Sequence, residues 1–165
     1  MIPLPISASD LRDAIISPAM RMLPAMMDTA EARVMLHAIA LQESGLAARS
    51  QANDGPAYGL WQFERGGGVV GVLTHPQSRD LAAWVCRRRN VSPNAQEVWA
   101  TLATSDVLAC CFARLLLWTD PAPLPIIRDV DGAWRLYART WRPGKPRPVA
   151  WPAFYAQAVQ AEMGP

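Results

Sequence analysis

The chain has 165 residues, of which 51% are hydrophobic and 18% are charged. This length and balance are typical of one compact soluble domain, so we predict a single domain over residues 1–165. Sixteen basic and 14 acidic residues leave a formal net charge of only +2. So small an excess does not favour a nucleic-acid binder, and we expect no nucleic acid among the partners.

The cysteines and the N-terminal segment bear on the cellular compartment in which we expect the chain to be made. Cys86, Cys110 and Cys111 are an odd number, and chain neighbours rarely pair, so we expect buried thiols rather than a disulfide framework. The segment 1–5 lacks the basic start and apolar run of a signal peptide. No apolar stretch reaches the roughly 18 residues that a membrane span needs. The longest, at 107–118, is short and contains Arg114.

Apolar residues recur at helical spacing along most of the chain, and strand-like alternation is scarce, so we predict an all-α fold with little or no β structure. A first helix is expected from Ser9 to Ile16, where Pro18 stops it. A short helical piece follows at 20–27.

A long apolar helix is predicted next. Asp28-Thr29-Ala30-Glu31 has the form of a capping box, with Glu31 three residues after the cap. The helix that it opens should end near Gly45. Residues 46–76 are rich in Gly, Asn, Asp and Pro and are expected to be an irregular, functional loop. We read the three glycines at 66–68 as a flexible segment or a tight turn.

Helical spacing returns after this loop. We expect a helix over 77–88, a second that Ser92 caps before Pro93, and a buried third that opens at Ser105-Asp106. Prolines 121, 123 and 125 exclude helix there. The last two helices are expected at 128–140 and 152–161.

Glu43 is the first candidate for chemistry. It lies at the end of an apolar helix, where lost hydration and the negative helix end should both raise its pKa. A carboxyl that stays protonated near neutral pH is what a glycosidase uses to protonate a leaving oxygen. The alternative is a solvated carboxylate at an ordinary helix end.

Two motifs at this spacing carry a resemblance. Gln42-Glu43-Ser44-Gly45 followed by Gly59-Leu60-Trp61-Gln62 resembles the soluble lytic transglycosylases and goose-type lysozymes of the lysozyme-like superfamily. Trp61-Gln62-Phe63-Glu64 and the glycines after it look more like small cell-wall-degrading proteins of tailed phages. The resemblance covers about residues 33–73. It implies a lysozyme-like helical domain that binds peptidoglycan glycan strands and uses Glu43 as its catalytic acid.

The resemblance also implies residues that bind substrate: Ser44, Tyr58, Gly59, Trp61 and Gln62. Gly59 allows a tight turn, and the amide of Gln62 suits sugar hydroxyls or N-acetyl groups. Trp61 is open between the core and a sugar-stacking platform. Tyr58 is open between the cleft and the surface.

A third family motif, Ala-Tyr-Asn, has no full counterpart here. Either Tyr137 takes the place of its tyrosine, or the segment from Trp141 to Gly144 matches its end; both Tyr137 and Trp141 are candidates for binding substrate. The alternative is one helix face, with Trp134, packed into the core. The basic residues Arg142, Lys145 and Arg147 are either solvated or placed to meet peptide-stem carboxylates.

Two reactions fit this set. A transglycosylase needs one carboxyl, because the C6 hydroxyl of the muramic sugar attacks its own anomeric carbon. A hydrolase adds a second carboxyl, for which Asp54 and Glu64 are candidates. Asp54 also suits a plain turn in Asn53-Asp54-Gly55-Pro56. We prefer the transglycosylase. A non-catalytic structural or wall-binding component of a phage particle is the alternative from another class.

No cofactor or metal is expected, since His37 and His75 lack metal-ligand spacing. The resemblance implies synthesis in the bacterial cytoplasm and action on the cell wall in the periplasm. With no signal peptide expected, a holin or a phage particle would have to deliver the protein.

Overall fold

The computed structural model describes residues 1–52 and 55–164. These residues are mostly helical, with 60% helix and 3% strand, which confirms the all-α prediction. In chain order the elements are α1 (Ala8–Asp10), η1 (Leu11–Ile16), α2 (Ser17–Met20), η2 (Ala25–Met27), α3 (Ala30–Ser44), β1 (Ala57–Tyr58), β2 (Phe63–Glu64), η3 (Arg65–Val69), α4 (Val70–Thr74), α5 (Arg79–Arg88), α6 (Ala95–Leu102), α7 (Asp106–Trp118), α8 (Val130–Trp141) and α9 (Trp151–Met163).

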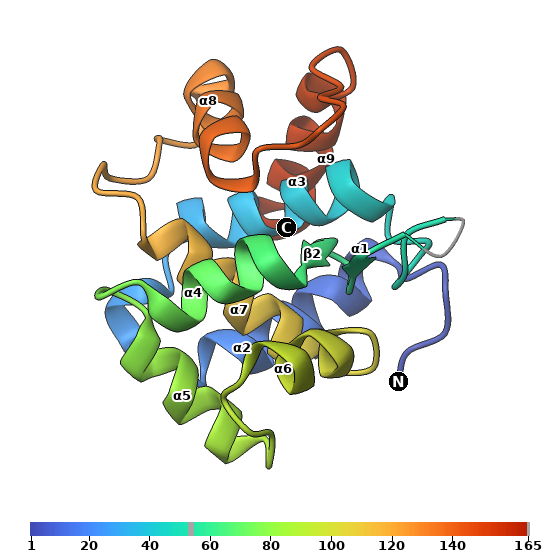
Figure 1. Cartoon of the computed structure of the whole chain (residues 1–165). Helices are drawn as coiled ribbons and strands as arrows, with labels where there is room; N and C mark the ends of the chain where they lie inside the picture. Colours follow the sequence, from blue (N-terminus) through green and yellow to red (C-terminus); the bar gives the residue numbers. More distant parts are fainter. Residues whose placement is uncertain (53–54, 165) are drawn as a thin grey trace.

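Helix α3 crosses the middle of the molecule, with α8 and α9 on one side and α4 to α6 on the other (Figure 1). Its second half and α7 are almost entirely buried. Helix α9 packs along α3, where His37 Nδ1 lies 2.9 Å from Glu162 Oε1 and both side chains are buried. Helix α3, which carries Glu43, is therefore held in place by its burial and by its packing against α9.

The cap of α3 differs from the expected one by one residue. Thr29 is the N-cap, and its Oγ1 accepts a hydrogen bond from the amide of Ala32 at 3.2 Å. Asp28, expected at the cap, instead binds the guanidinium of Arg33 at 2.6 and 2.9 Å. The helix ends as predicted at Gly45, which adopts a left-handed conformation with φ +59°.

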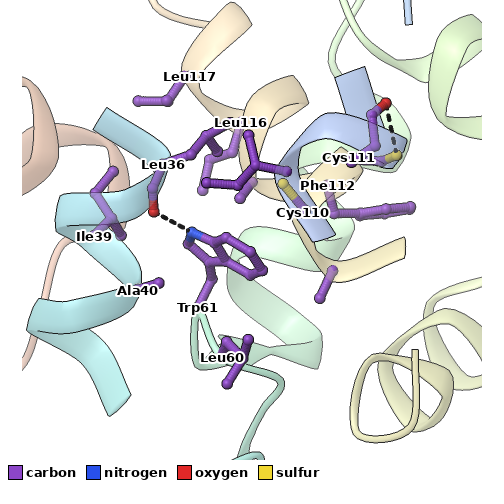
Figure 2. Packing of buried hydrophobic residues seen from close by; sticks show 14 of the residues in the cluster. Leu36, Ile39, Ala40, Leu60, Trp61, Cys110, Cys111, Phe112, Leu116 and Leu117 are labelled. Atoms are coloured by element: carbon purple, nitrogen blue, oxygen red, sulfur yellow. Dashed lines mark hydrogen bonds between the residues drawn. The ribbon is translucent and has the colours of Figure 1, made fainter. Parts of the chain in front are cut away.

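The core holds the three cysteines, as predicted: Cys86, Cys110 and Cys111 are all buried and free. Trp61 is inserted between α3 and α7, and its indole Nε1 donates to the carbonyl oxygen of Leu36 at 2.9 Å (Figure 2). The loop that carries the second motif is thereby anchored to the helix that carries the first.

Two predicted boundaries were wrong. Pro18 does not stop the first helix, which runs on to Met20; the residues before it form a π-helical turn, so Pro18 lies in the first turn of α2, where its missing N–H is tolerated. Asn94, not Ser92, caps α6, and its side chain accepts from the amide of Glu97 at 2.9 Å.

The segment 46–76, expected to be irregular, contains a short antiparallel hairpin of β1 and β2 and then the helical elements η3 and α4. The glycines at 66–68 are helical, not a flexible turn. A Cβ on Gly68 would lie 2.7 Å from the ring of Phe63, so glycine permits this turn to pack on the ring. Val69 and Val72, at the end of η3 and in α4, are fully buried. Packing has overridden the low helix propensity of glycine.

The short helical piece expected at 20–27 is helical only at its ends, in α2 and η2, whereas the later helices follow the predictions closely. Helices α5, α8 and α9 begin and end within about two residues of the expected positions, and α7 begins at Asp106 as expected. The proline segment between α7 and α8 is not helical. Within the described residues no single helix is long and apolar enough to cross a membrane, although the bent pair of α6 and α7 passes the same test when taken together.

Candidate active site

A cleft of about 1320 Å³ opens beside the C-terminal end of α3. Its walls are the hairpin with η3 and α4, the C-terminal end of α7, and α8 with the loop that follows. Typical pockets for small molecules hold about 300–1000 Å³. The larger volume and the open form of this cleft suit an extended ligand.

Glu43 lies in this cleft, in the last turn of α3. The hydroxyl of Tyr137, from α8, donates a hydrogen bond to Glu43 Oε1 at 2.5 Å. Tyr137 is itself 2% exposed and stacks on Trp151, with ring centroids 5.2 Å apart. The hydroxyl is thus held by a packed aromatic cluster, and it fixes one oxygen of the carboxyl.

The surroundings of Glu43 act on its pKa in opposite directions. Burial raises the pKa above its ordinary value and is the largest effect. The hydrogen bond from Tyr137 and the positive charge of Arg147 lower it, because both stabilise the carboxylate. The net result is a raised pKa, in a group that both neighbours help to hold as an anion once it has lost its proton. Burial also raises the pKa of Tyr137, which keeps that hydroxyl a donor.

Arg147 comes from the proline-rich loop between α8 and α9. Its guanidinium donates to the backbone carbonyl of Gln42, and the Gln42 side-chain amide donates back to the Arg147 carbonyl at 3.2 Å. This reciprocal pair ties the loop to the end of α3, beside Glu43. Arg142 and Lys145, the other basic residues of this loop, are exposed and line the cleft.

Gln62 also lines the cleft, at the turn of the hairpin. Its backbone has φ +49°, and its side-chain amide donates to the carbonyl of Gly59 at 2.8 Å. Gly59 does not line the cleft but shapes it. Its φ is +77°, and a Cβ there would lie 3.0 Å from the carbonyl oxygen of Leu102 and 3.2 Å from Ala109. Glycine is thus required at 59 for conformation and for space.

Besides Gly59, two predicted binding residues lie outside the lining of the cleft. Trp61 is fully buried and does not line the cleft, so the sugar-platform alternative for it is wrong; its indole packs between two helices. Tyr58 also lies outside the described lining and stacks on Trp99, with ring centroids 4.2 Å apart. Sequence alone did not show which face of the hairpin each aromatic ring would take.

Trp141 supplies the aromatic wall of the cleft. It is partly exposed, its indole Nε1 donates to the carbonyl of Trp61 at 3.0 Å, and its ring lies near Phe63. Phe63 is 2% exposed and belongs to the core. Trp134 is packed against Tyr137 and Trp151, so this face of α8 serves both the core and the cleft.

Among the described residues, the other carboxyls of the cleft are Glu64 and Asp120. Glu64 is exposed on β2. Asp54, the other predicted second carboxyl, lies outside the described residues. Asp120 was missed by the sequence analysis. It accepts two hydrogen bonds from Arg139, at 2.6 and 3.0 Å, which hold the pKa of Asp120 below its ordinary value. Asp120 is therefore an anion at neutral pH and no proton donor.

Ser44 also lines the cleft, as a candidate for binding substrate. Its hydroxyl donates to the carbonyl of Ala40 at 3.0 Å and accepts from the amide of Leu46 at 3.3 Å. It therefore contributes first to the end of α3. Across the described residues no three His, Cys, Asp or Glu side chains are placed to hold a metal ion.

The chain matches no family model, no curated protein and no solved structure.

Proposed function

We propose that this protein cleaves the glycan strands of peptidoglycan between N-acetylmuramic acid and N-acetylglucosamine, by lytic transglycosylation. The observation that carries the proposal is the partly buried Glu43 carboxyl, with its raised pKa, in a large open cleft. The contact between Tyr137 and Glu43 joins the residues of two motifs that lie 94 positions apart. This pairing supports the resemblance drawn from the sequence.

The chemistry would use Glu43 twice. Protonated Glu43 gives its proton to the glycosidic oxygen as the bond from that oxygen to the anomeric carbon breaks. The carboxylate that remains is stabilised by the Tyr137 hydroxyl and by the charge of Arg147. It then takes the proton of the C6 hydroxyl while the C6 oxygen bonds to the anomeric carbon. The products are a 1,6-anhydro sugar end and a free hydroxyl on the leaving sugar.

The rest of the cleft supplies contacts for a sugar polymer. Trp141 offers an aromatic face of the kind on which sugar rings stack, and Gln62, on the hairpin to which the Trp141 indole is hydrogen-bonded, also lines the cleft. In this scheme Gly59 and Trp61 shape the hairpin and do not contact sugar.

A hydrolytic muramidase is the second candidate, because Glu64 projects from a cleft-lining strand as a possible base or nucleophile. The resemblance to phage proteins further leads us to propose synthesis in a bacterial cytoplasm and action on the periplasmic cell wall. Delivery would be by a holin or as part of a phage particle.

The test uses purified peptidoglycan, the wild-type protein and two matched variants. Glu43→Gln should slow clearing by at least about a hundredfold, the scale of a lost general acid, while its circular dichroism stays unchanged. Glu64→Gln should clear at nearly the wild-type rate if one carboxyl suffices. Clearing by folded Glu43→Gln at the wild-type rate would remove Glu43 from the mechanism.

Mass spectrometry of the fragments separates the two reactions. Transglycosylation leaves anhydro ends, each lighter by one water than the reducing ends that hydrolysis leaves. Reducing ends, together with a loss of activity in Glu64→Gln or Asp54→Asn, would replace our proposal with the hydrolase.

A further inference from the structure

A second hollow, of about 810 Å³, adjoins one end of the cleft. It lies between the N-terminal turn of α3, the C-terminal end of α7 and the proline-rich segment that follows α7. It shares four lining residues with the cleft: His75, Thr119, Asp120 and Pro121. A ligand that lies in the cleft can therefore extend a branch into this second pocket.

Arg114 lies in the lining of the second pocket, although it is only 2% exposed. Its Nε donates to the carbonyl of Met27 at 2.9 Å, and its guanidinium carbon lies 5.1 Å from the centre of the Trp118 ring. Among the described residues Nη1 has no hydrogen-bond partner. Burial lowers the pKa of Arg114 to about 10, which still leaves the group charged at neutral pH. A buried cation with an unused donor favours an anionic partner.

The rim of the second pocket is apolar and exposed. Met26 is 72% exposed and Ile126 is 68% exposed, and both belong to the lining. Large apolar side chains that stay exposed around a concave site are typical of a binding site. They suit a ligand with methyl or methylene groups next to its anionic end.

Two carboxylates complete the lining. The charge of Asp120 is matched by Arg139, as described above. Glu31, in the first turn of α3, offers a carboxylate to the same pocket. A ligand that carries an amine as well as a carboxylate therefore finds a partner of opposite charge for each.

We propose that the second pocket binds a short peptide through its free carboxylate, with Arg114 as the anion partner and Met26 and Ile126 against its aliphatic groups. On the proposed function, on which this inference rests, the peptide is the stem that branches from a muramic sugar held in the cleft. Stem peptides carry free carboxylates, alanine methyl groups and, in many walls, a diamino acid. The enzyme would then prefer glycan strands that still bear their stems.

Binding is tested first, without catalysis. A free stem peptide, L-Ala-γ-D-Glu-L-Lys-D-Ala, is titrated into Glu43→Gln protein by calorimetry. The double variant Met26→Glu/Ile126→Glu places negative charge on the rim and should weaken binding at least about tenfold. Met163→Glu, at an exposed methionine outside both pockets, is the matched control and should bind as the parent does. No binding, or equal binding by all three proteins, would overturn the proposal.

Arg114→Met tests the buried cation directly, with thermal melting beside it because the residue is in the core. If Arg114→Met does not fold, the rim variants decide the matter, since both rim residues are exposed.

Cleavage then separates this proposal from the proposed function. Wild-type protein should cleave intact strands faster than strands stripped of stems by an amidase, and the rim double variant should lose that preference. Equal cleavage of both substrates by the wild type would overturn the stem site and leave the function standing. Peptide binding without cleavage of either substrate would keep the site and overturn the function.

Discussion

At the scale of single residues, opposing effects act on the pKa of Glu43. This one residue therefore affects both the proposed chemistry and the pH dependence of stability. Burial keeps its carboxyl protonated to higher pH, while Tyr137 and Arg147 favour the anion. A proton donor that must later act as a base needs both influences. The position of Glu43 at the end of a fixed helix supplies the first, and residues from distant parts of the chain supply the second.

This balance predicts how stability depends on pH. The pKa of Glu43 in the folded protein lies above its ordinary value of 4.5, so the folded state holds this proton more tightly than the unfolded state does. As pH rises from the ordinary value through the raised value, the wild type loses stability. Glu43→Gln has no charge to bury and keeps an acceptor for Tyr137, so it should melt higher than the wild type at about pH 8 and lose this advantage near pH 4.

Thermal melting over this pH range checks that prediction, with Glu64→Gln as the control at an exposed carboxyl. An advantage of Glu43→Gln that grows towards low pH would contradict the assigned sign.

Tyr137→Phe makes a separate prediction about the reaction. Loss of the hydrogen bond removes support from the Glu43 carboxylate, so the pKa of Glu43 should rise further and the alkaline limb of the pH–rate profile should move to higher pH. The rate should fall about ten- to a hundredfold, the scale of one hydrogen bond to a charged group.

Tyr155→Phe is the matched control for this variant. Tyr155 is another buried tyrosine, and within the described part of the chain its hydroxyl has no partner. An identical loss of rate in both variants would point to packing instead of the hydrogen bond.

At the scale of elements, the hairpin of β1 and β2 gains its shape from a few close contacts. Gly59 sits against the backbone of Leu102 at a positive φ, and Trp61 anchors the turn to α3. Gly59 and Trp61, which do not line the cleft, therefore fix the position of the cleft wall that carries Gln62.

Gly59→Ala should lower the free energy of unfolding by about 1–3 kcal/mol, because an alanine there adds left-handed strain to a short contact with the Leu102 carbonyl. Gly71→Ala is the control: it lies in α4 with no atom within 4 Å of the added methyl and should stabilise by about 0.5–1 kcal/mol. Urea unfolding of both variants measures the difference. Equal effects of the two substitutions would remove Gly59 from this role.

The elements that could be predicted from the sequence are those with local signals. Helix α3 has an apolar run, a polar cap and a terminal glycine, and α7 has an apolar stretch that only Arg114 interrupts, so both were found. The helical turns η3 and α4 were not, because three glycines argue against helix, and the packing of Gly68 on Phe63 that decides the matter is not local.

The site divides in the same way. Glu43 and Gln62 were found through motifs and line the cleft. Tyr137 was placed only as one of two registers, and its contact with Glu43 needs the three-dimensional arrangement. Trp61 was left open between the core and a sugar platform, because an indole suits both, and the structure places it in the core. Asp120 was missed because nothing beside it in the sequence shows that Arg139 would hold it at the cleft.

At the scale of the whole molecule, two helical groups meet on α3 (Figure 1). The C-terminal end of α3 lines the cleft, and its N-terminal turn lines the second pocket. The ties across this junction come from far along the chain: α9 is fixed to α3 by the buried pair of His37 and Glu162, and the loop before α9 by Arg147. The position of Glu43 thus depends on segments near the C-terminal end of the sequence.

The buried cysteines allow the rate at which the core opens to be measured. Burial raises the pKa of Cys86 to about 11 and that of Cys111 to about 12, and Cys110 lies deeper still. Only a thiolate reacts readily with an alkylating reagent, so the folded protein should stay unlabelled. Under excess reagent, each labelled molecule reports one opening of the core.

Intact-mass spectrometry should accordingly show two populations, one unlabelled and one carrying three labels. The rate at which the second population replaces the first would measure how often α5 and α7 come apart. A molecule with a single label would show instead that one part of the core opens alone. The three thiols, which have no part in the proposed chemistry, therefore report how often the core of the folded protein opens.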